Sequence, residues 1–132
     1  MRATLRGVAV LSCIIIVEML HGIARTIFLA PALGDFRARQ VAVFTGSILI
    51  LAIAISFIRW IRPASAGEAL RVGIVWMVLM LGFEMAFGRY VVQAPWSRIA
   101  SDYNLLQGGM LPIGLLVLAA APLIAAKVRH VL

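Results

Sequence analysis

Four long apolar stretches alternate with short polar segments along this chain. The stretches cover approximately residues 7–30, 41–59, 72–92 and 105–126. A helix needs about 20 residues to cross the hydrocarbon core of a bilayer, and each stretch is close to that length. The pattern therefore predicts an all-α membrane protein with four transmembrane helices in an antiparallel bundle. The short connections leave residues 1–132 as a single domain.

The connections carry residues that end helices. Pro31 follows the first stretch, residues 32–40 read as a short loop, and residues 63–67 have the composition of a turn. Pro95 ends the third stretch. The longest connection, residues 96–107, has an amphipathic pattern, and we expect a short helix lying at the membrane surface there.

Composition supports a bilayer as the natural environment of the chain. Hydrophobic residues make up 64% of the 132 residues, and charged residues make up 13%. Soluble domains carry about 25% charged residues. A soluble core of this size has too little interior to bury so much apolar surface. We therefore expect the lipid bilayer to be the main partner of the chain.

The positive charge of the chain flanks the apolar stretches. The net charge is +7. The sequence lacks the stripe of basic and aromatic residues that is typical of nucleic-acid binding, so we expect no nucleic-acid partner. Basic residues favour the cytoplasmic side of membrane proteins. Seven of the 12 lysine and arginine residues would lie on the same side of the membrane as the termini, and five on the opposite side. This distribution predicts a multi-pass protein of the inner (plasma) membrane with both termini in the cytoplasm.

Three ionisable residues interrupt the first apolar stretch. Glu18, His21 and Arg25 are spaced at i, i+3 and i+7, so a helix places them on one stripe. A charged side chain at the centre of a bilayer costs about 2.5–3.5 kcal/mol on insertion scales. The stripe is therefore expected to face protein or water rather than lipid.

The third apolar stretch repeats part of this pattern. Glu18-Met19-x-x-Gly22 and Glu84-Met85-x-x-Gly88 are 66 residues apart, half the length of the chain, and Gly7 and Gly73 share the same offset. Two repeated helical hairpins would explain this spacing, as in transporters built from parallel repeats. The alternative is coincidence within an apolar composition. A true repeat would bring the two glutamates to facing helices.

These residues form the candidate site. The substrate- or ion-binding candidates are Glu18, His21, Arg25, Glu84 and Arg89. At the outer mouth of the site, the candidates are Arg98, Asp102 and Tyr103, which could hold an anionic group or serve as interfacial anchors. Removal from water favours the neutral form of a carboxyl group, and a second nearby carboxylate adds to this effect. The cluster therefore favours binding or transport of a small solute or a proton.

A structural role is the alternative to transport. Buried charges can hold helices in register without any ligand, and small-residue spacings such as Gly22-x-x-x-Thr26, Gly82-x-x-x-Ala86 and Ala121-x-x-x-Ala125 permit close helix approach. The chain would then be a non-catalytic subunit or assembly factor of a larger membrane complex. We therefore expect the chain to form a homo-oligomer or to be a subunit of a membrane complex.

Enzymatic and cofactor signals are weak. The sequence has no glycine-rich phosphate loop, catalytic triad or paired cysteines, so we expect no cofactor and favour a non-enzyme. Glu18-x-x-His21 has the spacing found in di-iron bundles, but that site needs the pair twice, and the corresponding position in the third stretch is Phe87. No metal is assigned, although a single site of Glu18, His21 and Glu84 stays open as an alternative.

Overall fold

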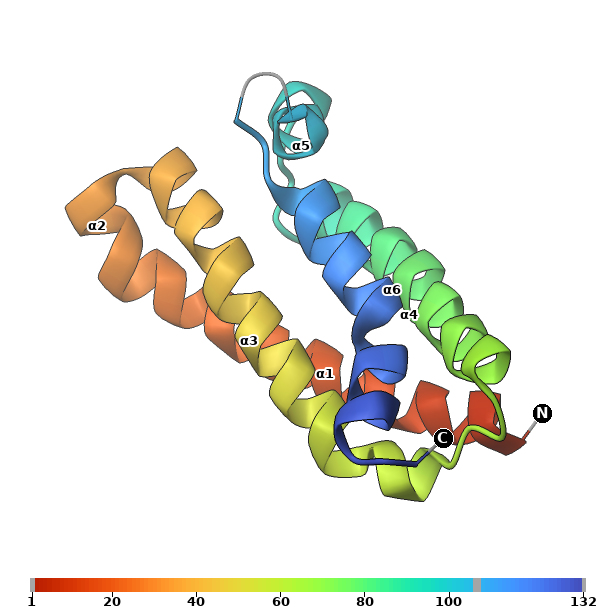
Figure 1. Ribbon diagram of the computed structural model, residues 1–132. Coiled ribbons are helices and arrows are strands. Elements are labelled where there is room, and N and C mark those ends of the chain that lie inside the picture. The colour runs from red at the N-terminus through yellow and green to blue at the C-terminus, as the bar shows by residue number, and fades with distance from the viewer. Residues whose placement is uncertain (1, 106–107, 132) are drawn as a thin grey trace.

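The structure is a computed structural model that describes residues 2–105 and 108–131. Within these residues, the long elements are all helices, and no strand occurs (Figure 1). The four long helices are α1 (Arg2–Ala24), α3 (Asp35–Ile61), α4 (Ala66–Ala86) and α6 (Leu111–Val128). The shorter elements are two π-helical segments, η1 (Arg25–Leu29) and η2 (Phe87–Val91), and the helices α2 (Ala30–Leu33) and α5 (Trp96–Tyr103).

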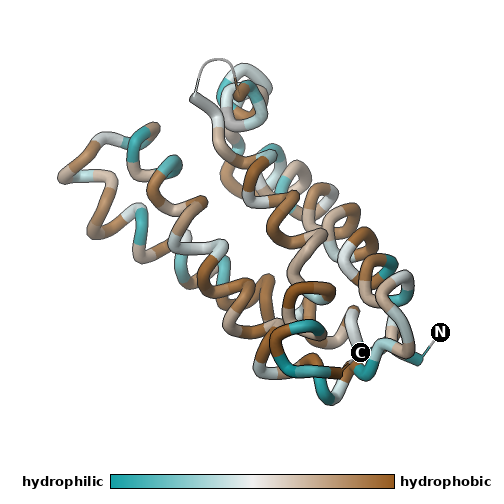
Figure 2. The backbone as a smooth tube through the Cα atoms, in the orientation of Figure 1, coloured by the Kyte–Doolittle hydropathy of each residue, from teal (hydrophilic) through white to brown (hydrophobic). Residues whose placement is uncertain are grey.

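Four helical stretches of the described chain are long and apolar enough to cross a membrane. They are Arg2–Leu33, Asp35–Ile61, Ala66–Val91 and Leu111–Val128. Figure 2 shows hydrophobic residues along the helices, with hydrophilic ones more frequent near the helix ends. These observations confirm the all-helical class and the four apolar helices expected from the sequence.

The connection between α1 and α3 is shorter than the expected loop at residues 32–40. Gly34 alone separates α2 from α3, and its backbone has φ +87°. Side chains disfavour this conformation, whereas glycine adopts it freely. The Gly34 N–H donates to the Ala30 carbonyl at 2.8 Å, and its own carbonyl accepts from the N–H of Ala38 at 3.0 Å. The chain therefore reverses at one residue, and most of the expected loop is helical.

The second half of the chain also departs from the expected boundaries. The expected helix in residues 96–107 is present as α5, and α6 begins at Leu111 with a proline in its first turn. Residues 106 and 107, at the expected start of the fourth span, lie outside the described residues. Pro122 lies inside α6 and is fully buried. Its missing N–H removes one helical hydrogen bond without ending the helix.

The hydrophobic core lies at the end of the molecule where α1 begins and α6 ends. α3 packs against α1 and α6, while α4 packs against α6 and α1 (Figure 1). Ile14, Ile58 and Trp76 are 0% exposed, and Leu118 is 1% exposed. Each long helix contributes one of these side chains. From this core, α1 and α4 separate toward their C-terminal ends (Figure 1).

Two glycines set the contacts of α4. The indole Nε1 of Trp76 donates to the carbonyl oxygen of Gly7 at 2.7 Å, which joins α4 to α1. A methyl group at Gly7 would lie 2.6 Å from Val72 of α4. A methyl group at Gly73 would overlap the backbone carbonyl of Ala119 in α6. The two glycines share the 66-residue offset of the sequence pattern, but they contact different helices.

The close approach at Gly73 predicts a strong effect of a single methyl group. In Gly73→Ala, α4 and α6 must move apart, and overpacking of this kind costs about 1–3 kcal/mol. Gly82 lies on the same helix and has no atom within 4 Å of a methyl group placed there. Gly82→Ala should therefore leave the stability unchanged or raise it by up to about 1 kcal/mol, because alanine favours helix.

Thermal unfolding of both variants in detergent micelles measures the difference. The expected order of melting temperature is Gly73→Ala below wild type, and Gly82→Ala equal to or above wild type. Equal melting temperatures for the two alanine variants would contradict the close contact of α4 with α6.

Candidate functional site

The carboxyl group of Glu18 lies in the contact between α1 and α3. It lies against Gly46 of α3, where a methyl group would be 2.8 Å from Oε2 of Glu18. The three atoms nearest to such a methyl group all belong to Glu18. Gly46 is buried, and its missing side chain makes the room that the carboxyl group occupies. The site thus begins with a glutamate on one helix and a glycine on the next.

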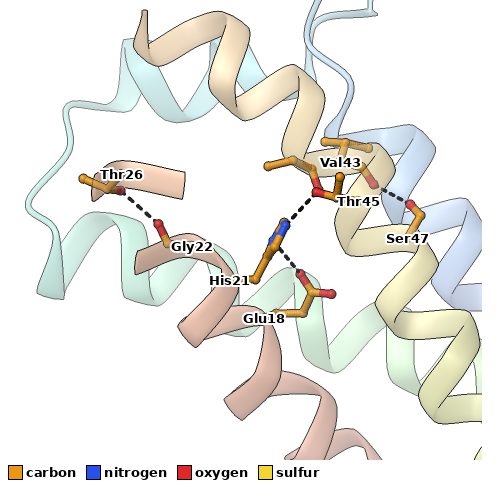
Figure 3. A network of polar contacts seen from close by, with 8 residues as sticks. Glu18, His21, Gly22, Thr26, Val43, Thr45 and Ser47 are labelled. Carbon is orange, nitrogen blue, oxygen red and sulfur yellow. Dashed lines mark hydrogen bonds and ion pairs between the residues drawn. The ribbon is translucent and has the colours of Figure 1, made fainter. Parts of the chain in front are cut away.

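His21 joins this carboxyl group to α3. Its Nδ1 lies 3.7 Å from Oε2 of Glu18, and its Nε2 lies 2.6 Å from Oγ1 of Thr45 (Figure 3). The side chains of His21 and Glu18 are 20% and 24% exposed. Glu18, His21 and Thr45 therefore form a polar contact between two apolar helices, in which Glu18 and His21 are partly buried and Thr45 is exposed.

The hydrogen bonds of Thr45 indicate which nitrogen of His21 carries a proton. The hydroxyl of Thr45 donates to the carbonyl of Ala42 at 3.3 Å. A hydroxyl has one proton to donate, and with that proton assigned to the Ala42 carbonyl, its oxygen accepts from His21. Nε2 of His21 is then the donor, and in the neutral ring Nδ1 presents its lone pair toward Glu18. The pair can hold one proton, either on the carboxyl group of Glu18 or on Nδ1 of His21.

One carboxyl oxygen of Glu18 remains available for a ligand or a proton. Within the described part of the chain, Oε1 is buried and has no hydrogen-bond partner. A buried carboxylate oxygen without a partner is costly, whereas a protonated oxygen or one that binds a cation is not. This arrangement favours a site that exchanges a proton or a small cation.

Arg25 lies at the end of the same stripe and begins the π-helical segment η1. Its charge acts on His21, four residues earlier. The Ala30 N–H donates to the Arg25 carbonyl, which gives the wider turn of a π-helix. Thr26 donates from Oγ1 to the Gly22 carbonyl at 3.0 Å (Figure 3). Short π-helical segments occur often at functional sites, and this one begins at Arg25, whose charge acts on His21.

The second half of the candidate cluster lies on α4 and η2. Glu84 is partly buried on α4, and Arg89 lies in η2, where its Nη1 donates to the Ala94 carbonyl at 3.3 Å. The guanidinium of Arg89 also lies 5.2 Å from the centre of the Trp96 ring. In the described part of the chain, the contacts of Glu18 and His21 run to α3. That Glu84 and Arg89 belong to the same site stays a prediction.

The outer-mouth candidates take separate positions. Nη2 of Arg98 on α5 lies 3.3 Å from Oδ2 of Asp35, which also pairs with Nε of Arg39 at 3.1 Å. The pair of Arg98 and Asp35 therefore links α5 to the start of α3. Tyr103 packs against the hydrophobic core. The side chain of Asp102 lies outside those that the structure describes.

The spacing of Glu18 and His21 allows a metal site as an alternative. Among the described residues, no group of three or more His, Cys, Asp or Glu side chains gathers where it could hold a metal ion. The described geometry is an ion-pair contact of Glu18 with His21 at 3.7 Å, and His21 has the hydroxyl of Thr45 as its second partner.

Sequence reasoning missed the residues of α3 that complete the site. Thr45 and Gly46 lie within an uncharged apolar stretch, where a threonine and a glycine are ordinary. The available signal was weak: polar or small residues in a membrane helix are favoured at contacts with neighbouring helices. Asp35 lies within the loop expected at residues 32–40, and its pairing with Arg98 depends on the position of α5 relative to the start of α3.

Comparison with protein-family models, curated proteins and solved structures finds no match to this chain.

The contact of Glu18 with Gly46 can be tested by a double-mutant cycle. In the wild-type background, Gly46→Ala forces the carboxyl group away from α3, and we expect a loss of stability. In a Glu18→Ala background, the same substitution meets open space and should be stabilising by up to about 1 kcal/mol through helix propensity. The expected coupling is about 1–3 kcal/mol from relief of overpacking.

Chemical or thermal unfolding of the four proteins in detergent measures the coupling. Gly82→Ala, paired with Glu18→Ala in the same way, is the matched control and should show no coupling. A Gly46→Ala effect that has the same sign and size in both backgrounds would show that the carboxyl group does not occupy this space.

Proposed function

We propose that this protein spans the inner membrane with its four apolar helices and that the Glu18–His21 pair carries a proton for the passage or binding of a small solute. Both ends of the chain would lie in the cytoplasm, the side favoured by the distribution of basic residues. The observation that carries the proposal is the set of polar contacts from Glu18 to His21 at 3.7 Å and from His21 to Thr45 at 2.6 Å, across the α1–α3 contact.

The proposed proton moves between Oε2 of Glu18 and Nδ1 of His21, which lie 3.7 Å apart and must come closer to form the hydrogen bond needed for transfer. When Glu18 is protonated, its O–H faces the lone pair of Nδ1 of His21. Transfer breaks this O–H bond, forms an N–H bond at Nδ1, and leaves a carboxylate beside an imidazolium ion. Nε2 keeps its proton and its bond to Thr45 in both states. The ring is thus held in place while the proton changes sides.

The alternation between the two states provides a means of coupling. With the proton on Glu18 the pair is neutral, and with the proton on His21 it is a dipole of opposite charges. A cation that approaches the carboxylate competes with this proton, because one carboxyl group cannot hold both. The chemical class most compatible with the site is therefore a proton or a small cationic solute, with Arg25 limiting the charge that the site accepts.

A non-catalytic role in a larger membrane complex is the second candidate. Gly22 and Gly82 have no atom within 4 Å of a methyl group placed at either position, so these glycines are not required for the helix contacts that the structure describes. Glycines on the surface of membrane helices permit close approach of another helix. In this case, the pair of Glu18 and His21 would only position α1 against α3.

Proton flux in liposomes separates the two candidates. Purified protein is reconstituted with an internal pH-sensitive dye, and a potassium diffusion potential drives proton movement. Glu18→Gln and His21→Gln should abolish the flux because each removes one site of the shared proton. Thr45→Val should reduce it, since Nε2 loses its acceptor and the ring is no longer held.

Ser47→Ala is the matched control on α3. Its hydroxyl bonds to the Val43 carbonyl of its own helix at 2.6 Å, outside the connection of Glu18, His21 and Thr45 (Figure 3). It should keep the wild-type flux. Absence of flux in the wild type, together with a lower melting temperature of Glu18→Gln, would contradict the proposal and favour the structural role.

A further inference from the structure

A pocket lined by arginines lies at the end of the molecule opposite to Glu18, where α1 begins and α3 ends. Its volume is about 360 Å³. We call it the arginine pocket; its lining residues are Arg2, Ala3, Arg6, Ile61, Arg62 and Glu68. Three arginines and one glutamate line it, so the lining carries a net positive charge. Ala3 and Ile61, which are 4% and 1% exposed, are the apolar residues of the lining.

One of these arginines is held in place by α3. Nη1 of Arg6 donates to the Trp60 carbonyl at 2.8 Å, and the guanidinium lies 5.5 Å from the centre of the Trp60 ring. This bond uses one of the five N–H groups of the guanidinium. The side chain is therefore ordered before any ligand binds, which lowers the entropy lost on binding.

Arg62 adopts an unusual backbone conformation at the pocket. It is the C-cap of α3, with φ 54° and ψ 61°, in the left-handed region. Glycine or asparagine usually occupies this position because a longer side chain is strained there. Strain of this kind is often found at functional positions. An arginine here, rather than glycine, adds a cation to the pocket at the expense of backbone strain.

The first turn of α1 adds to the positive potential. It contains no acidic residue, although the positive end of a helix dipole favours one. By contrast, the start of α4 has Glu68 in its first turn and the hydroxyl of Ser65 as its cap, at 3.1 Å from the N–H of Glu68. Because the first turn of α1 lacks the acidic residue that the first turn of α4 has, the α1 side of the pocket favours an anion.

We propose that the arginine pocket binds the phosphodiester headgroup of an anionic phospholipid. Arginine forks match the oxygens of a phosphate, and basic pockets between membrane helices on the cytoplasmic side bind lipid headgroups. Trp60 beside Arg6 fits this placement, since tryptophan is enriched at the membrane–water interface. The inference rests on the membrane placement proposed above, but not on the proton pair.

Native mass spectrometry of the detergent-purified protein with added phosphatidylglycerol tests the proposal. Wild type should retain one lipid per chain in preference to phosphatidylcholine. Arg2→Gln and Arg62→Gly should each weaken this binding about tenfold. Arg62→Gly also relieves the backbone strain, so its melting temperature without lipid should equal or exceed that of wild type. Loss of binding is then separated from loss of folding.

Arg71→Gln is the matched control. Arg71 is exposed near the start of α4, at the same end of the molecule, and outside the pocket lining. Arg71→Gln removes one positive charge outside the pocket and should keep wild-type lipid binding. Glu18→Gln should also keep it, because its expected defect is the loss of proton flux. Equal weakening by Arg71→Gln, unchanged binding in Arg62→Gly, or displacement of the lipid by soluble glycerol phosphate at equal concentration would each overturn the assignment.

Discussion

The contact of α4 with both α1 and α6 determines the arrangement of the molecule. Two glycines allow it: Gly7 brings α1 close enough for its carbonyl to accept from the indole of Trp76, and Gly73 brings α4 against the backbone of α6. Trp76 is fully buried between these contacts. Because the core lies at this one end, α1 and α4 are free to separate toward the other.

The separation of α1 from α4 has a chemical consequence. The polar stripe of α1 lies beyond the core, where α4 has moved away and α3 supplies the partners. Glu18 then occupies the space left by Gly46, and His21 reaches Thr45. In a bilayer, this contact would keep the carboxyl group away from the acyl chains without a buried ion pair of opposite fixed charges. The proposed movement of a proton between Glu18 and His21 depends on this contact.

The sequence predicts the helices well because their length and apolar composition are local properties. The stripe of Glu18, His21 and Arg25 follows from helical periodicity alone. The turn at Gly34 does not, since a positive φ cannot be distinguished from an ordinary loop glycine by composition. Thr45 and Gly46 could not be identified either, because their role depends on which face of α3 meets α1. The 66-residue offset does not predict which helices are in contact, because Gly7 and Gly73 share it but pack against different helices.

The position of the proton on His21 is the most direct test of the central claim. The chain has two histidines, so His130→Gln leaves His21 as the only one for nitrogen NMR of labelled protein in lipid bilayers. The shared-proton arrangement predicts that Nε2 stays protonated throughout a pH titration and that the protonation of Nδ1 changes when Glu18 is replaced by glutamine. A neutral ring with its proton on Nδ1, or a titration identical in Glu18→Gln, would contradict it.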